Sequence, residues 1–173
     1  KEHLLALKEK LSSTFGGNLT LTLNETDTSE WQEGWKDSFK PFETKRFHVF
    51  PPWEAENISS SKMRLEVEPG MAFGTGHHET TWLVLTKLIK YVKRDTKVLD
   101  CGSGSGILSI AAKKLGAKHI DSIEFDLDCK SNFLENLQLN NIQDDIIYNN
   151  INILKWKDFN YDLILANINK LTI

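Results

Sequence analysis

The chain has 173 residues, of which 40% are hydrophobic and 26% charged, with a net charge of −3 and a pI near 6.0. That length suffices for one well-buried domain and a small additional segment, because single domains usually run to roughly 100–200 residues. The weak negative charge argues against a surface that binds mainly phosphate, so we expect no direct nucleic-acid binding. A protein or small-molecule partner fits this charge better.

Cysteine content and hydropathy indicate the compartment. The chain has two cysteines, Cys101 and Cys129, which we expect to be reduced thiols of a cytoplasmic protein. No segment approaches the ~18 consecutive apolar residues of a membrane span, so we expect no membrane association, and we expect a monomer. The sequence starts without Met and stops soon after a strand-like segment, so we also expect a fragment of a longer protein.

The first 44 residues predict a small α+β segment. Leucines at three- and four-residue spacing predict a helix over 2–13, and alternation of leucine with polar residues predicts a strand over 19–24. An aromatic-rich stretch follows at 29–42. It fits either core packing at a domain junction or a direct role in binding substrate.

Residues 45–66 are expected to connect two domains through strands at 46–50 and 63–68, the second of which runs just beyond this segment. From residue 67 onward we predict an α/β domain that extends to 173. The predicted elements are a helix over 80–91, a strand over 97–100, a helix over 107–115, a strand over 119–124, a helix over 128–139, and strands over 145–149 and 161–166. Strands that alternate with helices predict an open parallel sheet with ligands at the carboxyl ends of its strands.

The strongest motif is a hydrophobic strand that runs into Asp100-Cys-Gly102-Ser-Gly104-Ser-Gly106 and then into a helix. Glycines allow a tight turn whose amides approach a ligand, and the helix N-terminus adds a positive dipole. A nicotinamide site would read GxGxxG, but here the third glycine comes one residue too early and an acid stands two residues before the first. This arrangement is typical of class I methyltransferases. Asp100 would hold either the turn or the amino group of the ligand.

A second acid ends the next predicted strand. Glu124 follows the glycines by about the 20 residues at which an acid can accept hydrogen bonds from ribose hydroxyls, and Asp126 is the second choice. Glu124 could also be an ordinary polar strand end.

The loop over 68–81 contains three glycines and leads into a helix. We expect its residues 70–81 to close over the ligand, with Phe73 as the apolar group that this loop buries and Thr75 among its hydroxyls. Alternatively, Phe73 lies permanently in the core. Adjacent His77 and His78 diverge, and no further ligand cluster is evident, so we expect no metal.

Asn167 comes at the carboxyl end of the last predicted strand, where its amide could bind a polar group next to the reacting methyl. Enzymes that methylate exocyclic amines of bases tend to have Asn/Asp-Pro-Pro-Tyr/Phe at this point. Asn167-Ile168-Asn169 differs from that pattern, which argues against a nucleobase acceptor.

Together, Ala-Phe-Gly-Thr-Gly-His-x-x-Thr-Thr at 72–81, the glycine-rich turn, the acid at 124 and Ala-Asn-Ile at 166–168 resemble the PrmA family, the methyltransferases of protein eleven of the large ribosomal subunit. The resemblance spans residues 31–168. It implies a Rossmann-like class I methyltransferase sheet, incomplete at its C-terminus, after part of a substrate-recognition domain at 1–44. Its cofactor contacts fall on Thr81, Gly102, Glu124 and Asn167, and the turn adds Gly104 and Asp100.

The resemblance implies transfer of methyl groups from S-adenosylmethionine to lysine or N-terminal amines of a large-subunit ribosomal protein, leaving S-adenosylhomocysteine. Asn167 would be the catalytic residue, through positioning. The family usually has Asp at 124, Cys or Thr at 103, and often an acid near 152, where this chain has Glu, Ser and Asn. Two alternatives are a class I methyltransferase with a different protein or small-molecule acceptor, and a cofactor-binding module without catalysis.

Overall fold

The computed structural model describes residues 10, 11, 14, 39–59, 61–70, 79–143 and 145–168. The chain divides into two compact units, Lys1–Lys36 and Asp37–Ile173. The helix expected over 2–13 lies largely, and the strand expected over 19–24 entirely, outside the described residues. The description below therefore concerns the second unit.

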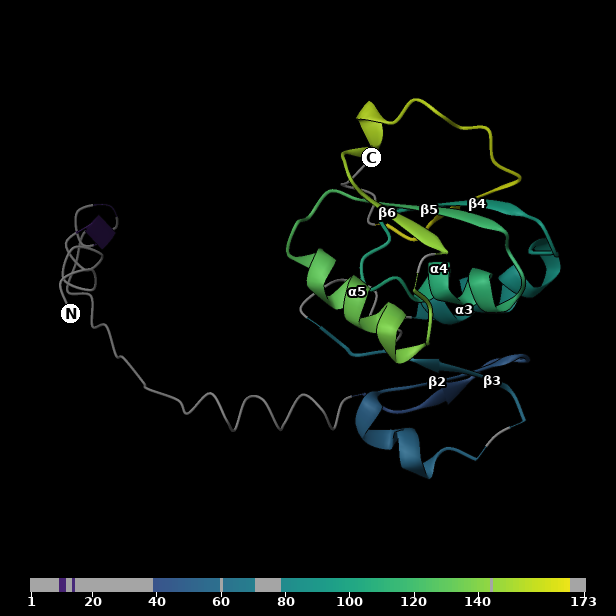
Figure 1. Ribbon diagram of the computed structural model, residues 1–173. Helices are drawn as coiled ribbons and strands as arrows, with labels where there is room; N and C mark the ends of the chain where they lie inside the picture. The colour runs from purple at the N-terminus through teal and green to yellow at the C-terminus, as the bar shows by residue number, and fades with distance from the viewer. Residues whose placement is uncertain are drawn as a thin grey trace. The chain divides into compact units, whose positions relative to one another are not determined.

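The described part of this unit contains two sheets and three α-helices (Figure 1). Its elements are β1 (Phe42–Glu43), β2 (Phe47–Phe50), the 3-10 helix η2 (Pro52–Asn57), β3 (Met63–Glu66), α3 (Glu79–Tyr91), β4 (Lys97–Cys101), α4 (Ile107–Lys114), β5 (His119–Glu124), α5 (Cys129–Leu139), β6 (Ile146–Asn150), the 3-10 helix η3 (Ile153–Lys155) and β7 (Leu163–Ala166). Each strand and helix predicted within 45–173 is found with bounds shifted by at most two residues. The sequence analysis did not predict β1, η2 or η3.

The larger sheet has four strands in the order β6-β5-β4-β7, and every neighbouring pair is parallel. This confirms the expected open α/β sheet. The chain runs from β4 outward through β5 to β6 and then crosses back to β7 on the other side of β4, so the strand order reverses at β4. Such a topological switch point is where open α/β sheets bind ligands, at the carboxyl ends of their strands.

The main core lies on one face of this sheet. Alternate strand residues, Val98 of β4 and Ile120 of β5, are fully buried with helix residues such as Leu85 and Ile110. Figure 1 shows α3, α4 and α5 between the four-stranded sheet and strands β2 and β3. The alternation follows from the two-residue period of a strand, which sends successive side chains to opposite faces.

The smaller sheet contributes to the same core. Its order is β1-β2-β3, with an antiparallel and a parallel pair. Phe47, Val49, Leu65 and Val67 from this region are at most 3% exposed and belong to the main cluster. The strands at 46–50 and 63–68, which we expected to connect two domains, thus lie within the second unit. The boundary between the two compact units falls between Lys36 and Asp37, whereas the sequence analysis expected the first domain to end at residue 44.

The opposite face of the four-stranded sheet is covered by the segment between β6 and β7. Leu99, Cys101 and Ile123 are buried there against residues of that segment, Ile151, Ile153, Trp156 and Tyr161. The Tyr161 hydroxyl donates a hydrogen bond to Asp121 Oδ2 at 2.8 Å, which attaches the segment to β5.

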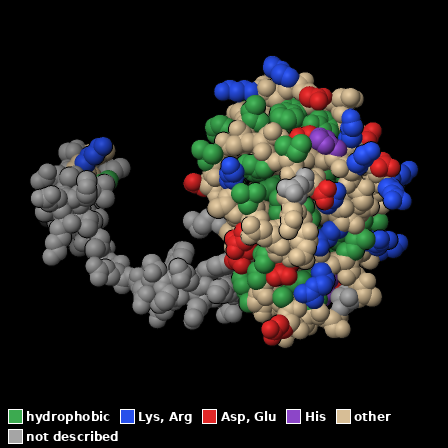
Figure 2. Space-filling view, in the orientation of Figure 1, with side chains coloured by type: hydrophobic (Ala, Val, Ile, Leu, Met, Phe, Trp, Pro, Cys, Tyr) green, Lys and Arg blue, Asp and Glu red, His purple; other side chains and the backbone are tan. Residues whose placement is uncertain are grey.

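The molecular surface drawn in Figure 2 carries acidic side chains as well as Lys and Arg.

Candidate functional site

A glycine-rich turn, residues 102–106, joins the carboxyl end of β4 to the start of α4. Gly102, Gly104 and Gly106 all have positive φ. At Gly102 (φ +69°) a Cβ would lie 2.1 Å from Ile168 Cγ2, so both the backbone and a close neighbour exclude a side chain. The sequence motif therefore forms the expected tight turn, which begins at the switch point.

The Glu124 carboxylate lies against this turn. Its Oε2 accepts a hydrogen bond from the Gly104 amide at 2.9 Å, and its Oε1 accepts from the amides of Phe125 and Asp126 at 2.8 and 3.0 Å. The two carboxylate oxygens have about four acceptor sites in all, so this acid retains acceptor capacity. Glu124 thus connects the end of β5 with the turn after β4.

Asp100 is buried below the turn. Asp100 is only 1% exposed, and its Oδ2 accepts a hydrogen bond of 2.6 Å from the Ser109 hydroxyl of α4. Ser109 Oγ also lies 2.7 Å from Ser122 Oγ of β5. Burial raises the pKa of Asp100 to about 6, against the lowering effect of the Ser109 hydrogen bonds. Of the two roles left open for Asp100, these contacts support the one that holds the turn.

Ser103 adds an unused polar group to the turn. The residue is 7% exposed, and its Oγ has no hydrogen-bond partner within the described part of the chain. Buried hydroxyls are generally hydrogen-bonded in folded proteins, to protein, water or ligand. The turn therefore offers a ligand one buried hydroxyl, whereas the amides of Gly102, Ser103, Gly104 and Gly106 already donate hydrogen bonds within the chain.

Thr81 and Asn167 are distant in sequence but meet on the side of β4 where β7 lies. Thr81, in the first turn of α3, is fully buried, and its Oγ1 accepts a hydrogen bond from Asn167 Nδ2 at 3.2 Å. Asn167 directly follows β7, so this contact lies beside the switch point. The structure thus brings together Thr81 and Asn167, both predicted from sequence as cofactor contacts.

The remaining predicted positions lie elsewhere. Phe73 and Thr75, like the His77-His78 pair and the rest of residues 71–78 in the loop expected to close over the ligand, lie outside the described residues. Asp126, the alternative to Glu124, is exposed. Within the described ranges no group of three or more His, Cys, Asp or Glu residues could hold a metal ion.

Sequence reasoning missed three residues that shape the turn. Ser109 hydrogen-bonds the buried Asp100, Ile168 packs over Gly102, and Asn136 of α5 donates a hydrogen bond to the Ser105 carbonyl at 2.9 Å. Only Asn136 left a usable signal, because asparagines recur at 132, 136 and 140 on one face of a predicted helix, where asparagine is unfavourable.

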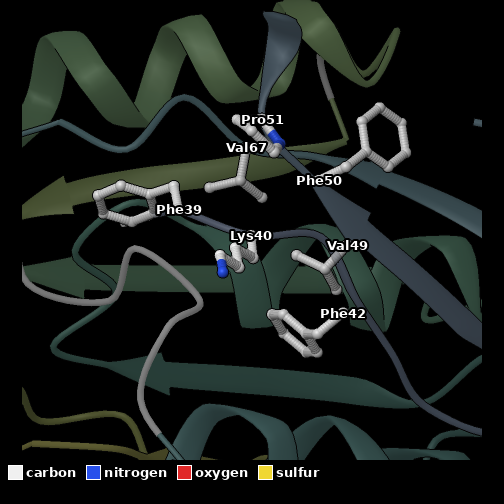
Figure 3. Close-up of a pocket in the computed structure, with 7 residues that line it drawn as sticks. All are labelled: Phe39, Lys40, Phe42, Val49, Phe50, Pro51 and Val67. Carbon is white, nitrogen blue, oxygen red and sulfur yellow. The ribbon is translucent and has the colours of Figure 1, made fainter. Parts of the chain in front are cut away.

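A separate pocket opens on the small sheet (Figure 3). Its lining is mostly apolar, with one charged residue, and consists of Phe39, Lys40, Phe42, Val49, Phe50, Pro51 and Val67. None of the predicted cofactor residues lines this pocket. It is therefore distinct from the site at the glycine-rich turn.

The parallel sheet, the DxGxGxG turn after its central strand, and the acid after the neighbouring strand together define a class I methyltransferase fold. A family model described as Ribosomal protein L11 methyltransferase (PrmA) matches residues 2–171. The chain belongs to the ribosomal protein L11 methyltransferase family.

Individual relatives agree with this membership. The chain is 40% identical over 154 residues to a ribosomal protein L11 methyltransferase of Anoxybacillus flavithermus, covering 88% of this chain and 49% of that protein. It is 38% identical over 170 residues to that of Clostridium perfringens, covering 97% and 53%. A crystal structure of ribosomal protein L11 methylase from Lactobacillus delbrueckii subsp. bulgaricus superposes with a TM-score of 0.63 at 33% identity, covering 72% of this chain and 64% of that one.

The chain spans about half the length of the curated relatives it matches. Over the residues that the structure describes, no helix is both long enough and apolar enough to cross a membrane.

Proposed function

We propose that this chain binds S-adenosylmethionine at the glycine-rich turn and belongs to an enzyme that methylates amino groups of a large-subunit ribosomal protein. The observation that carries the proposal is the contact of the Glu124 carboxylate with the Gly104 amide. This contact puts an acceptor for a ribose hydroxyl beside the glycine-rich turn. The names of the relatives, ribosomal protein L11 methyltransferases, support the acceptor.

The residues around the turn fit this cofactor. Gly104 carries no side chain that would block a ligand, and the buried Ser103 hydroxyl offers it a hydrogen bond, while the space beside Gly102 is taken by Ile168. Glu124 would accept from a ribose hydroxyl with the one acceptor site, of about four, that its three amide donors leave, while Asp100 would hold the turn from below. Phe73 and Thr75 are proposed cofactor contacts on sequence alone.

Thr81 and Asn167 would orient the reacting groups. S-adenosylmethionine supplies an electrophilic sulfonium methyl when bound, and S-adenosylhomocysteine is the product. A lysine acceptor must lose a proton, which near pH 7 costs about 4.6 kcal/mol from a pKa of about 10.4. None of the proposed site residues is an evident base, so we assign catalysis to alignment, which can contribute roughly 7–11 kcal/mol, with solvent taking the proton.

In this proposal the protein acts in the cytoplasm as a monomer and does not bind nucleic acid directly. Two other functions use the same cofactor site: methylation of a different protein or small molecule, and cofactor binding without turnover. Mass spectrometry of acceptors treated with the full-length enzyme separates the first from ribosomal protein methylation. Binding of cofactor without any methylated product would identify the second.

Cofactor binding can be tested on this chain by titration calorimetry. We expect S-adenosylhomocysteine to bind and NAD not to bind. Glu124→Ala should weaken binding of S-adenosylhomocysteine by about 1.5–3 kcal/mol, the range for hydrogen bonds to a charged group. Asp126→Ala is the matched control, since it removes the neighbouring exposed acid and should leave the affinity unchanged. Heat with NAD and none with S-adenosylhomocysteine would contradict the cofactor, and a reversed order of the two variants would move the ribose contact to Asp126.

The role of Asn167 requires the full-length enzyme. Asn167→Ala removes the amide that donates to Thr81, and we expect turnover to fall by more than the affinity for S-adenosylhomocysteine does, because the amide acts on alignment. The measurement is kcat with a ribosomal protein acceptor beside a calorimetric Kd. Equal losses in both quantities would make Asn167 a cofactor ligand only.

A further inference from the structure

Three asparagines form a ladder on α5 and at its end. Asn132, Asn136 and Asn140 follow one another at four-residue spacing and are 8%, 0% and 6% exposed. Residues four apart lie on the same face of a helix, so the three amides project to one side. Asparagine is a poor helix former, and three of them buried on one face must be stabilised by what they contact.

The ladder runs along the extended segment that follows β3. Asn140 accepts from the Glu66 amide at 3.2 Å and donates to the Glu66 carbonyl at 2.6 Å, as a neighbouring strand would. Asn136 Oδ1 accepts from the Glu68 amide at 2.7 Å, and Asn132 Nδ2 donates to the Glu68 carbonyl at 2.9 Å. The side chains of α5 thus satisfy the backbone of this segment.

The repeat distances of a helix and an extended chain explain why all three asparagines meet the segment that follows β3. Two residues of extended chain advance by about 6.6 Å, and four residues of helix by about 6 Å. Glu66, Glu68 and Gly70 therefore come opposite Asn140, Asn136 and Asn132 in turn. At the last step the chain passes so closely that a Cβ on Gly70 would lie 2.6 Å from Asn132 Cγ.

Asn136 differs from Asn140 because it also reaches the glycine-rich turn. Its Nδ2 donates to the Ser105 carbonyl at 2.9 Å, while its Oδ1 holds the Glu68 amide. Ser105 lies between Gly104 and Gly106, which have φ of +50° and +80°, inside the turn that the hydrogen bond from the Gly106 amide to the Ser103 carbonyl closes at 2.8 Å. The side chain of one fully buried residue thus joins the turn to the segment that leads into residues 71–78.

We infer that Asn136 is a positioning residue for cofactor binding: it holds the Ser105 carbonyl and thereby keeps the glycine-rich turn in the conformation that accepts the ligand. The inference rests on the proposed function of the turn. Without the amide, the hydrogen bonds of Asn136 to the Ser105 carbonyl and the Glu68 N–H are lost in a buried place, and the turn can relax into conformations that bind less well.

The test compares Asn136→Ala with Asn140→Ala. Both remove a ladder amide from the same helix face, but only the first removes a contact with the turn. For each variant we would measure the Kd of S-adenosylhomocysteine by calorimetry and the free energy of unfolding in urea. We expect both variants to be destabilised, and only Asn136→Ala to lose affinity, by about tenfold or more, while Asn140→Ala stays within about twofold of the wild type.

Three results would overturn the inference. Unchanged affinity in a folded Asn136→Ala protein would show that the turn keeps its conformation without the amide. Equal losses of affinity in both variants would make the ladder a purely structural device. No binding by the wild-type protein would instead contradict the proposed function, and with it this inference.

A second variant covers the case in which Asn136→Ala does not fold. Asn136→Leu keeps a side chain of similar size, so it leaves a smaller cavity than alanine does, but it offers the Ser105 carbonyl no hydrogen bond. The same tenfold loss against Asn140→Ala is expected. Affinity equal to that of Asn140→Ala would refute the positioning role.

Discussion

Asp100 shows how one buried residue makes stability depend on pH. Its pKa is about 6 in the folded protein, against an ordinary value of 3.8, because burial disfavours the charged carboxylate. Between these two pH values the folded state holds a proton that the unfolded chain has released. The free energy of unfolding should therefore fall as pH rises from about 4 to about 6, and this contribution should be level above that.

Asp100→Asn cannot titrate, so we expect it to remove this fall, which amounts to about 3 kcal/mol for a shift of about two pKa units. The measurement is urea unfolding at a series of pH values, read as the difference between variant and wild type. Asp158→Asn, which alters an exposed acid, should keep the wild-type slope. Parallel profiles for Asp100→Asn and the wild type would contradict the raised pKa.

At the scale of the element, α5 has two faces of very different importance. Phe133 is fully buried, its ring centroid lies 4.8 Å from that of Tyr148, and a Cβ on Gly106 would lie 2.8 Å from its ring. Leu134, the next residue, is 42% exposed. Phe133 therefore attaches the helix both to β6 and to the glycine-rich turn.

Phe133→Ala should destabilise the protein by about 3–5 kcal/mol, because it removes a buried aromatic ring and leaves a cavity. Leu134→Ala should cost about 1 kcal/mol or less, since it empties a position that is partly in solvent. Denaturant unfolding of the two variants gives both numbers. Similar losses would show that α5 is held by something other than its buried face.

For the whole molecule, the position of the main core predicts which truncated chain keeps a cooperative fold. Its buried members run from Phe47 to Leu165, so they all lie in the second compact unit. We expect residues 37–173 to unfold cooperatively, with a midpoint close to that of the full chain. Residues 67–173, the domain expected from the sequence, would lack Phe47, Val49 and Leu65 and should not fold alone.

Circular dichroism and urea titration of these two truncated chains check this prediction. Deleting residues 1–36 leaves the described core unchanged. A cooperative transition in 67–173 would show that β2 and β3 are dispensable, and its absence in 37–173 would show that the first unit supports the second.

Contiguous patterns could be read directly from the sequence. The two-residue and 3.6-residue periods predicted the strands and helices from 46 to 166, because burial of one face leaves a local signature. The glycine-rich turn and Glu124 were found for the same reason, since each depends on a few neighbouring residues next to a strand end. Asn167 was also found at a strand end, and the resemblance added Thr81, which the structure shows in hydrogen-bond contact with Asn167.

Contacts between residues distant in sequence could not be predicted and became visible only in the folded structure. Asn136 and Glu68 are 68 residues apart, and no periodicity in either segment indicates that the amide of one replaces a strand partner of the other. The same holds for Ile168 over Gly102 and for the packing of β2 and β3 into the main core. Local periodicity and turn chemistry were enough to predict the main helices and strands from 46 to 166 and the residues at the strand ends. Which buried polar groups satisfy one another, and where the compact unit begins, depends on the surfaces that meet when the chain packs, and no local pattern records those.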